Sequence, residues 1–224
     1  MKNIADYRVE IKTGQYQIAT ENDKKMVDAI FGDKSAYKFE LYFHWFNLIH
    51  ELGHVIIEFS SHQRVDPAEE ELLVNEFAIA YWKHYGEKEK FQELEWIVTK
   101  GLERFGIPND LKVEEDFITY AKEKWRTEEF WSFNSYGWFQ FSCVDQAINK
   151  DICLESVLTK MGVQTSVYQV EEILKYDEPE TMSECVVFDA LTELRKWGVT
   201  LPEEINLVYS DDPNCHMCVF TEIN

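Results

Sequence analysis

Apolar and polar residues alternate near the start of the chain, and further along the chain the apolar residues recur at helical spacing. Residues 7–19 alternate around Thr13-Gly14, which predicts two short strands joined by a tight turn. From about Ser35 to Phe59 the apolar residues recur at helical spacing, with many aromatic residues and no proline. We therefore predict one long, mostly buried helix there, or two in succession. A further helix is predicted from about Pro67 to His84, because an Asp-Pro pair followed by glutamates is typical of a helix N-terminus.

The second half of the chain is predicted to be a set of helices that closes with a hairpin. Residues 205–209 and 216–222 alternate again on either side of the turn-rich residues 210–214, which predicts two paired strands. Helical patterns occupy six segments, which are residues 87–105, 113–125, 136–149, 153–161, 167–175 and 183–197.

Together these elements predict an α+β, mainly α-helical fold. Residues 1–86 would form a core with a small N-terminal sheet, and residues 87–224 a mainly helical cover that packs with this core as one unit. The chain of 224 residues is 45% hydrophobic, with only nine glycines and five prolines, which argues against a disordered or linker-rich protein. Its length suffices for one sizeable hydrophobic core.

The net charge narrows the choice of partners. Lys and Arg number 22, whereas Asp and Glu number 42, which gives a formal charge of −20. A field of this sign repels phosphate backbones, so we expect no nucleic-acid partner. The same field would attract a basic peptide or protein segment, although a solubilising acidic surface is the commoner meaning of such a charge.

Neither a signal peptide nor a membrane span is predicted. The N-terminal residues lack the apolar core that a signal peptide needs, and no apolar run approaches the roughly 18 residues of a membrane-spanning helix. The five cysteines are odd in number and scattered, which suits free thiols in a reducing compartment better than disulfides. We therefore expect a cytoplasmic protein without a membrane partner.

A short motif in the first long helix carries the strongest chemical signal. It reads His50-Glu51-Leu52-Gly53-His54, an H-E-x-x-H sequence. Residues four positions apart differ by only about 40° around a helix, so both imidazoles leave the same face and can bind one Zn²⁺ ion. Glu51 would lie beside the ion, where it can take a proton from zinc-bound water as a general base. Gly53 lowers helix stability, which indicates close approach by another backbone.

A third ligand is needed if the ion is to keep one position open for water. On a helical wheel of about 100° per residue, Glu71 lies on the apolar stripe of the second helix and Glu76 on the solvated side. We therefore expect Glu71 to be the ligand, and Asn75, one turn later, to hold a ligand by a hydrogen bond. Another interpretation is that the glutamates of this region form a solvated first turn favoured by the helix dipole; these are Glu69, Glu70, Glu71 and Glu76.

The second predicted helix contains another motif, Glu71-Leu72-Leu73-Val74-Asn75-Glu76-Phe77-Ala78. This motif and the H-E-x-x-H sequence together resemble the ImmA/IrrE type of zincin-like metallopeptidases, whose second motif has the form E-x-x-A-N-x-F-A; Val74 replaces the usual Ala. The resemblance implies a zincin-like fold for residues 1–86. It also implies that zinc is bound by His50, His54 and Glu71, and that Glu51 is the catalytic base.

The chain departs from this family in ways that limit the comparison. The resemblance covers only about residues 40–82, and Ile79-Ala80-Tyr81-Trp82 replaces the family's Leu-Leu-Met-Pro-like run, so no substrate is implied. No helix-turn-helix or sensor module is recognisable, so a role linked to transcription is not implied either. The Asn75-Glu76 pair also resembles the Asn-Glu pair of thermolysin-like and aminopeptidase zincins, where the glutamate is the ligand. Glu76 therefore stays the alternative third ligand.

Weaker signals have structural as well as functional interpretations. The aromatic-rich residues 130–141 could line a substrate cleft, with Tyr136 or Asn134 donating a hydrogen bond to an oxyanion, or could simply be core. Residues 215–218 have C-x-x-C spacing, but no second pair completes a four-ligand zinc site, so two thiols in a terminal strand are expected. Three lone histidines, His44, His62 and His84, are explained by surface or core positions. Two residues of the loop between the two helices, His62 and Arg64, could nevertheless reach the cleft.

The sequence therefore predicts a cytoplasmic zinc-dependent endopeptidase that acts on a peptide or protein, a basic one being attracted by the charge. The alternative is a zincin-derived binding or regulatory protein that keeps zinc for structure alone. The two differ in coordination, because a structural site closes its fourth position with a protein ligand and has no use for a base.

Overall fold

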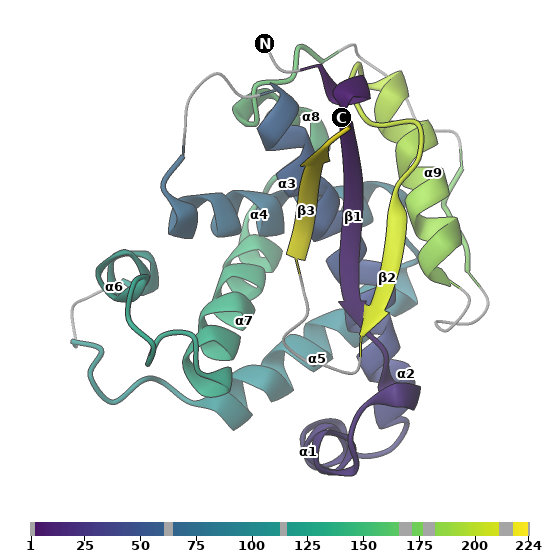
Figure 1. Cartoon of the computed structure of the whole chain (residues 1–224). Coiled ribbons are helices and arrows are strands. Elements are labelled where there is room, and N and C mark those ends of the chain that lie inside the picture. Colours follow the sequence, from purple (N-terminus) through teal and green to yellow (C-terminus); the bar gives the residue numbers. More distant parts are fainter. Residues whose placement is uncertain are drawn as a thin grey trace.

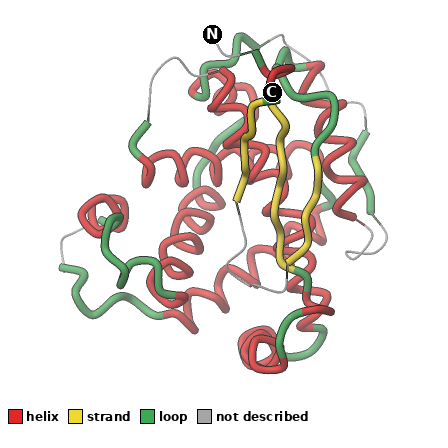
Figure 2. The backbone as a smooth tube through the Cα atoms, in the orientation of Figure 1, coloured by secondary structure: helices red, strands yellow, loops and turns green. Residues whose placement is uncertain are grey.

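The sheet is formed by both ends of the chain. The structure, a computed structural model, describes residues 3–60, 65–112, 116–165, 172–176, 182–210 and 217–223. In these residues a three-stranded sheet stands against a larger body of helices, so the predicted α+β, mainly α-helical class is confirmed (Figures 1 and 2).

The central strand of the sheet is β1 (Tyr7–Gly14). It pairs in parallel with β2 (Asn206–Ser210) and antiparallel with β3 (Met217–Glu222). Both predicted hairpins are therefore wrong: a short 3-10 helix, η2 (Tyr16–Ile18), follows β1, and the two C-terminal strands do not pair with each other. Alternation identifies a strand, but it does not say which strand lies beside it.

The predicted long helix is present as one continuous helical run with a change of winding. α2 (Ser35–Glu40) passes into a π-helical segment, η3 (Leu41–Phe46), and then into α3 (Asn47–Ser60). A helix that the sequence analysis did not identify, α1 (Glu21–Phe31), precedes this run and begins at the N-cap Thr20.

α4 (Pro67–Tyr85) begins as predicted, because the Asp66 side chain accepts a hydrogen bond of 3.0 Å from the backbone N–H of Ala68. It packs directly on α3. A Cβ atom added to Gly53 would lie 2.9 Å from Cβ of Val74, so this glycine lets the two helices approach closely. The close neighbour is thus a side chain of α4, where another backbone was predicted.

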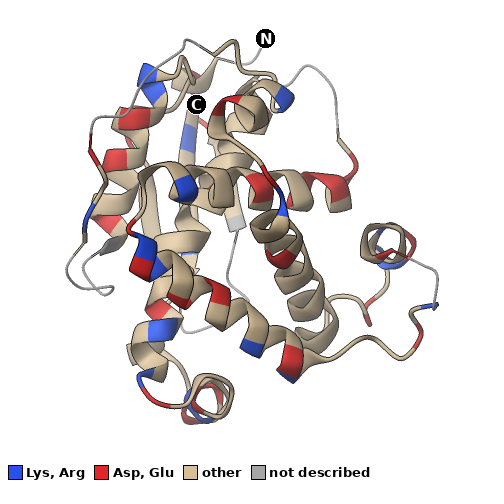
Figure 3. Ribbon diagram, turned by 180° about the vertical axis from the view of Figure 1, so that it is seen from behind, with Lys and Arg blue, Asp and Glu red and all other residues tan. Residues whose placement is uncertain are grey.

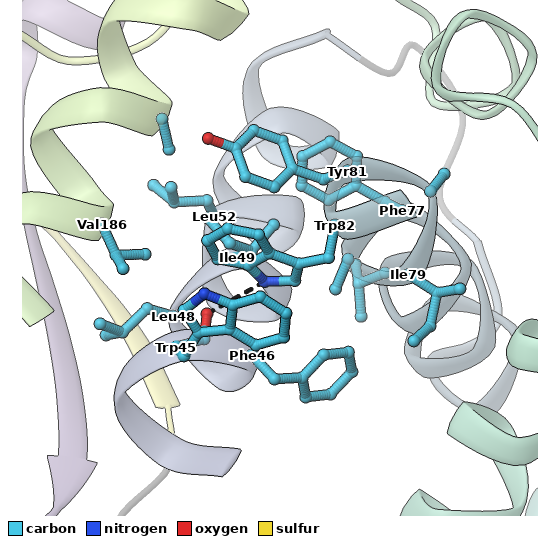
Figure 4. Packing of buried hydrophobic residues seen from close by; sticks show 14 of the residues in the cluster. Trp45, Phe46, Leu48, Ile49, Leu52, Phe77, Ile79, Tyr81, Trp82 and Val186 are labelled. Atoms are coloured by element: carbon cyan, nitrogen blue, oxygen red, sulfur yellow. Dashed lines mark hydrogen bonds between the residues drawn. The ribbon is translucent and has the colours of Figure 1, made fainter. Parts of the chain in front are cut away.

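Stacked aromatic rings form the centre of the core between the first helical run and α4. The indoles of Trp45 and Trp82 lie 3.9 Å apart at an interplanar angle of 15°, and Trp82 Nε1 donates a hydrogen bond of 3.1 Å to the Trp45 carbonyl (Figure 4). Both side chains are almost fully buried. Such packing makes α3 and α4 a rigid support for the residues that their other faces carry.

The later helices agree with the predicted pattern except at one segment. They are α5 (Lys88–Phe105), α6 (Phe117–Lys124), α7 (Phe133–Asn149), α8 (Leu154–Lys160) and α9 (Met182–Lys196). A helix was predicted at 167–175, but residues 172–176 are not helical, and Leu174 instead donates its N–H to the Tyr85 carbonyl over 2.8 Å. Residues 167–171 lie outside the described residues, as does most of the predicted turn at 210–214.

One hydrophobic cluster contains side chains from both sides of the predicted boundary at residue 86, for example Ile49 and Val186. The boundary itself stays a prediction. Acidic residues are spread along the helices rather than gathered in one segment (Figure 3). In the described part of the chain, none of the helices combines the length and the apolar character needed to cross a membrane.

Candidate metal site

Two helices bring three predicted ligands together. Nε2 of His50 lies 3.4 Å from Oε2 of Glu71, and Nε2 of His54 lies 3.8 Å from Oε1 of the same carboxylate. One ligand atom from each of the three residues lies within 4.8 Å of the others. Bonds of about 2.0–2.2 Å in a tetrahedral zinc site place ligand atoms roughly 3.3–3.6 Å apart. The spacing of these atoms is therefore close to what such an ion requires.

Each imidazole is oriented by a hydrogen bond at its other nitrogen. His50 Nδ1 lies 3.2 Å from Asn75 Oδ1, and His54 Nδ1 lies 2.8 Å from Glu70 Oε1. An oxygen beside Nδ1 places the ring proton there and leaves the Nε2 lone pair for a metal. Asn75 is where the sequence predicted a supporting residue. Glu70 was one of the four glutamates considered, but its contact with His54 was not predicted.

The orientation of the Asn75 amide follows from its neighbours. Its Nδ2 donates to the Glu71 carbonyl over 2.9 Å and to Gln140 Oε1 over 3.0 Å. Both amide protons are used, so Oδ1 must face His50 and accept the proton of its Nδ1.

Gln140, on α7, completes a ring of contacts around the site. Its Nε2 donates 2.7 Å bonds to Glu71 Oε2 and to the Tyr136 hydroxyl. The ring runs from His50 through Asn75 and Gln140 to Glu71, and back to His50. Gln140 was not predicted from the sequence; its position a helical turn after Tyr136 is a signal that could have indicated it.

Opposite charges of the histidines and glutamates in the cluster stabilise one another. Burial lowers the pKa of His54, but its hydrogen bond to Glu70 and the charges of Glu71 and Glu51 outweigh burial and raise this pKa to about 9. Burial raises the pKa of Glu71, but the hydrogen bond to His50 and the charges of His54 and His50 outweigh burial and lower it to about 2. The cluster thus stabilises positive charge at its centre, which a cation could also supply.

Glu51 lies on α3 between the two histidines, and its carboxylate is close enough to interact with the charges of His50 and His54. Its side chain is buried, and Asn47 Nδ2 donates a hydrogen bond of 3.3 Å to its Oε1. Burial raises the pKa of Glu51, and the positive charges of His50 and His54 partly oppose this shift. A carboxylate with a raised pKa is better suited to accept a proton near neutral pH.

Glu76 does not belong to this cluster. The residue is 4% exposed, and its carboxylate forms ion pairs with Lys150 and with Lys160, the latter at 3.3 Å. The prediction that Glu76 lies on a solvated face is therefore wrong. The helical wheel identifies the more apolar face of α4, but it cannot show that residues after α7 and in α8 cover the other one.

Tyr136 is the member of the aromatic-rich segment that reaches the site, with its hydroxyl 3.5 Å from Glu71 Oε1. The other residue proposed there, Asn134, is exposed at the start of α7.

Cys218, on β3, is partly buried, and burial together with the charge of Glu51 raises the pKa of its thiol. The strand β3 thus passes close to the Glu51 carboxylate.

The two other described histidines lie among backbone and aromatic groups. His44 is buried, with Nε2 2.9 Å from the Gly14 carbonyl, and His84 is partly buried against the rings of Tyr85 and Trp197. Free thiols are confirmed for the described cysteines, which are Cys143, Cys153, Cys185 and Cys218. Some residues considered earlier lie outside the described residues; these are His62, Arg64, Cys215 and His216.

No protein-family model, no curated protein and no solved structure matches this chain. The case for a function therefore rests on the geometry of the site.

Proposed function

We propose that this protein is a zinc-dependent peptidase in which His50, His54 and Glu71 hold the ion and Glu51 is the general base. The observation that supports this most directly is the orientation of the two imidazoles. Both turn Nε2 toward the Glu71 carboxylate, while Asn75 and Glu70 occupy their Nδ1 atoms. Histidines that served only packing would not need this arrangement of inner and outer partners.

The ligand set also favours catalysis over a purely structural ion. Two imidazoles and one carboxylate leave a tetrahedral ion one open position, which is typical of catalytic zinc. When bound, the ion would polarise a peptide carbonyl and lower the pKa of water. Glu51 would take a proton from the attacking water and return it to the leaving amine, and burial raises its pKa in the direction that favours this exchange.

Tyr136 would assist at the carbonyl oxygen. Its hydroxyl oxygen accepts a hydrogen bond from Gln140, and its own proton faces Glu71 Oε1 over 3.5 Å, which is longer than a good O–H···O bond. This donor is therefore available to a substrate oxygen that gains negative charge beside the ion.

The family assignment is part of the same proposal. The H-E-x-x-H motif lies on α3, the E-x-x-x-N motif lies on α4, and the residues of the two motifs meet, as a distant ImmA/IrrE-like zincin would require. A cytoplasmic location and a basic peptide or protein substrate are also proposed, on the basis of the cysteine usage and the formal charge of −20.

Exchange of Glu51 for Gln tests the proposal. The zinc content of wild type, Glu51→Gln and the control Glu58→Gln on the same helix would be measured, together with cleavage of a peptide library. We expect all three to bind one equivalent of zinc, and Glu51→Gln to lose cleavage by at least about a hundredfold. Unchanged cleavage by Glu51→Gln would remove this residue from the mechanism.

The competing candidate is a binding or regulatory protein with structural zinc. In the described residues, three His and Glu side chains come together at the site, which favours the catalytic candidate. X-ray absorption of the zinc-loaded protein separates the two: a water in the fourth position supports the peptidase, and a fourth protein ligand supports the structural role.

A further inference from the structure

A chain of aromatic rings leads from the metal site to the protein surface. The Tyr136 ring, whose hydroxyl approaches Glu71, lies 4.9 Å from the ring of Trp131 at an interplanar angle of 32°. Only the width of one phenol therefore separates Trp131 from a metal ligand. An extended peptide advances about 3.3–3.6 Å per residue, so a substrate side chain about two or three positions from the cleaved bond can reach this indole.

Trp131 is exposed and yet held in place. Its side chain is 49% exposed, and its indole N–H donates a hydrogen bond of 2.8 Å to the Trp125 carbonyl. The Trp125 ring packs against its edge at 5.0 Å, and the Phe130 ring lies 5.7 Å away. Phe130 is 1% exposed and belongs to a buried cluster, so the exposed indole rests on a rigid support. A large apolar surface fixed in this way is suited to binding.

The segment that leads to Trp131 has a net negative charge. Glu128 and Glu129 are exposed and directly precede the aromatic residues Phe130 and Trp131, and they outnumber the one exposed basic residue beside them, Arg126. The whole chain has a formal charge of −20. Lys or Arg residues next to an apolar side chain would therefore be attracted to this edge of the site.

We propose that Trp131 and Tyr136 form a specificity subsite for an aromatic or large aliphatic side chain of the peptide substrate, with basic residues preferred beside it. This inference rests on the proposed peptidase function. It deepens that function by specifying the class of substrate.

The test compares Trp131→Ala with Trp96→Ala. Trp96, on α5, is a matched control because it is 40% exposed and is covered by the Lys38 ammonium, 3.9 Å from its ring centre. Zinc-loaded wild type should cleave a peptide library with a preference for aromatic or large aliphatic residues at one fixed position. Trp131→Ala should weaken that preference about tenfold or more, and Trp96→Ala should keep it.

A second measurement does not depend on cleavage. Binding of labelled peptides to zinc-loaded Glu51→Gln is compared with binding to the double variant Glu51→Gln/Trp131→Ala. The peptides carry Phe or Ala at the preferred position. If nothing is cleaved, Phe and Ala are compared at each position in turn. We expect the Phe peptide to bind about tenfold more tightly than the Ala peptide, and this difference to vanish without Trp131. If zinc-loaded wild type cleaves nothing, the peptidase proposal fails, whereas the subsite is still decided by binding. The subsite proposal is contradicted if no peptide binds, or if Trp131→Ala leaves the difference in affinity between the Phe and Ala peptides unchanged.

Discussion

Gln140 donates a hydrogen bond of 2.7 Å from Nε2 to Oε2 of Glu71, and through this contact α7 supports the carboxylate that α4 offers to the metal. Its Oε1 accepts a proton from Asn75, which in turn accepts one from His50. A single amide thus holds one proposed ligand directly and another through one intermediate residue. Outer partners of this kind affect the metal affinity of a site because they fix the direction of its ligands.

Replacement of Gln140 by Leu should lower zinc affinity about ten- to a hundredfold, because Glu71 loses a donor and the Asn75 amide loses the partner that helps to orient it. Competition with a chromophoric chelator would measure this affinity. The control is Gln146→Leu, an amide on the same helix α7. Equal affinities of the two variants would show that Gln140 does not position the ligands.

Glu71 and Glu76 should respond in opposite ways to exchange for Ala. Glu71→Ala should lose most zinc binding, because it removes one of three ligands. Glu76→Ala should keep zinc binding but lose about 1 kcal/mol of folding free energy, because it breaks the partly buried ion pairs with Lys150 and Lys160. Zinc titration and urea denaturation of both variants test this pair. Weaker zinc binding by Glu76→Ala than by Glu71→Ala would transfer the ligand to Glu76.

Gly53→Ala should destabilise the protein by up to about 2 kcal/mol. Ala favours a helix over Gly by about 1 kcal/mol, but its methyl group would lie 2.9 Å from Cβ and Cγ1 of Val74, and overpacking costs about 1–3 kcal/mol. Urea denaturation measures the change. In the double variant with Val74→Ala, part of the clash remains at Cβ, so a double-mutant cycle should show partial relief. A more stable Gly53→Ala protein would mean that the two helices can move apart.

We expect His84, near the end of α4, to make the free energy of unfolding depend on pH. Burial lowers the pKa of His84. The unfolded state, with its ordinary pKa near 6.5, therefore takes up a proton first as the pH falls. This contribution to stability is present above about pH 6.5 and is lost as the pH falls toward the lower pKa of the folded state.

His84→Phe tests this effect, because Phe keeps an aromatic ring against Tyr85 and Trp197 but cannot titrate. Urea denaturation of both proteins at about pH 7.5 and pH 5.5 compares their losses of stability. The variant should lose less than wild type over this range. Equal losses would show that His84 does not contribute.

The sequence could predict those features of the fold and the site that depend on residues close together along the chain. The aromatic helical run, the Asp66 cap of α4 and the two motifs are written in residues that lie close together along the chain. Helical periodicity places His50 and His54 on one face, since both lie within one turn of the same helix. Glu71 was favoured by the same reasoning, although the accompanying expectation for Glu76 was wrong.

Contacts between distant segments were decided by the tertiary structure alone. Nothing in the alternation of residues 7–19 shows that β1 would lie between two C-terminal strands, because strand partners depend on which edges the fold brings together. Likewise, Gln140 is 69 positions from Glu71, and Lys150 is 74 from Glu76. The candidate metal ligands could be read from the sequence, because they lie within one helical turn of α3 and on the helix that follows it. Only the packing of α7 and α8 on α4 decided which glutamate faces the site and which is paired with lysines.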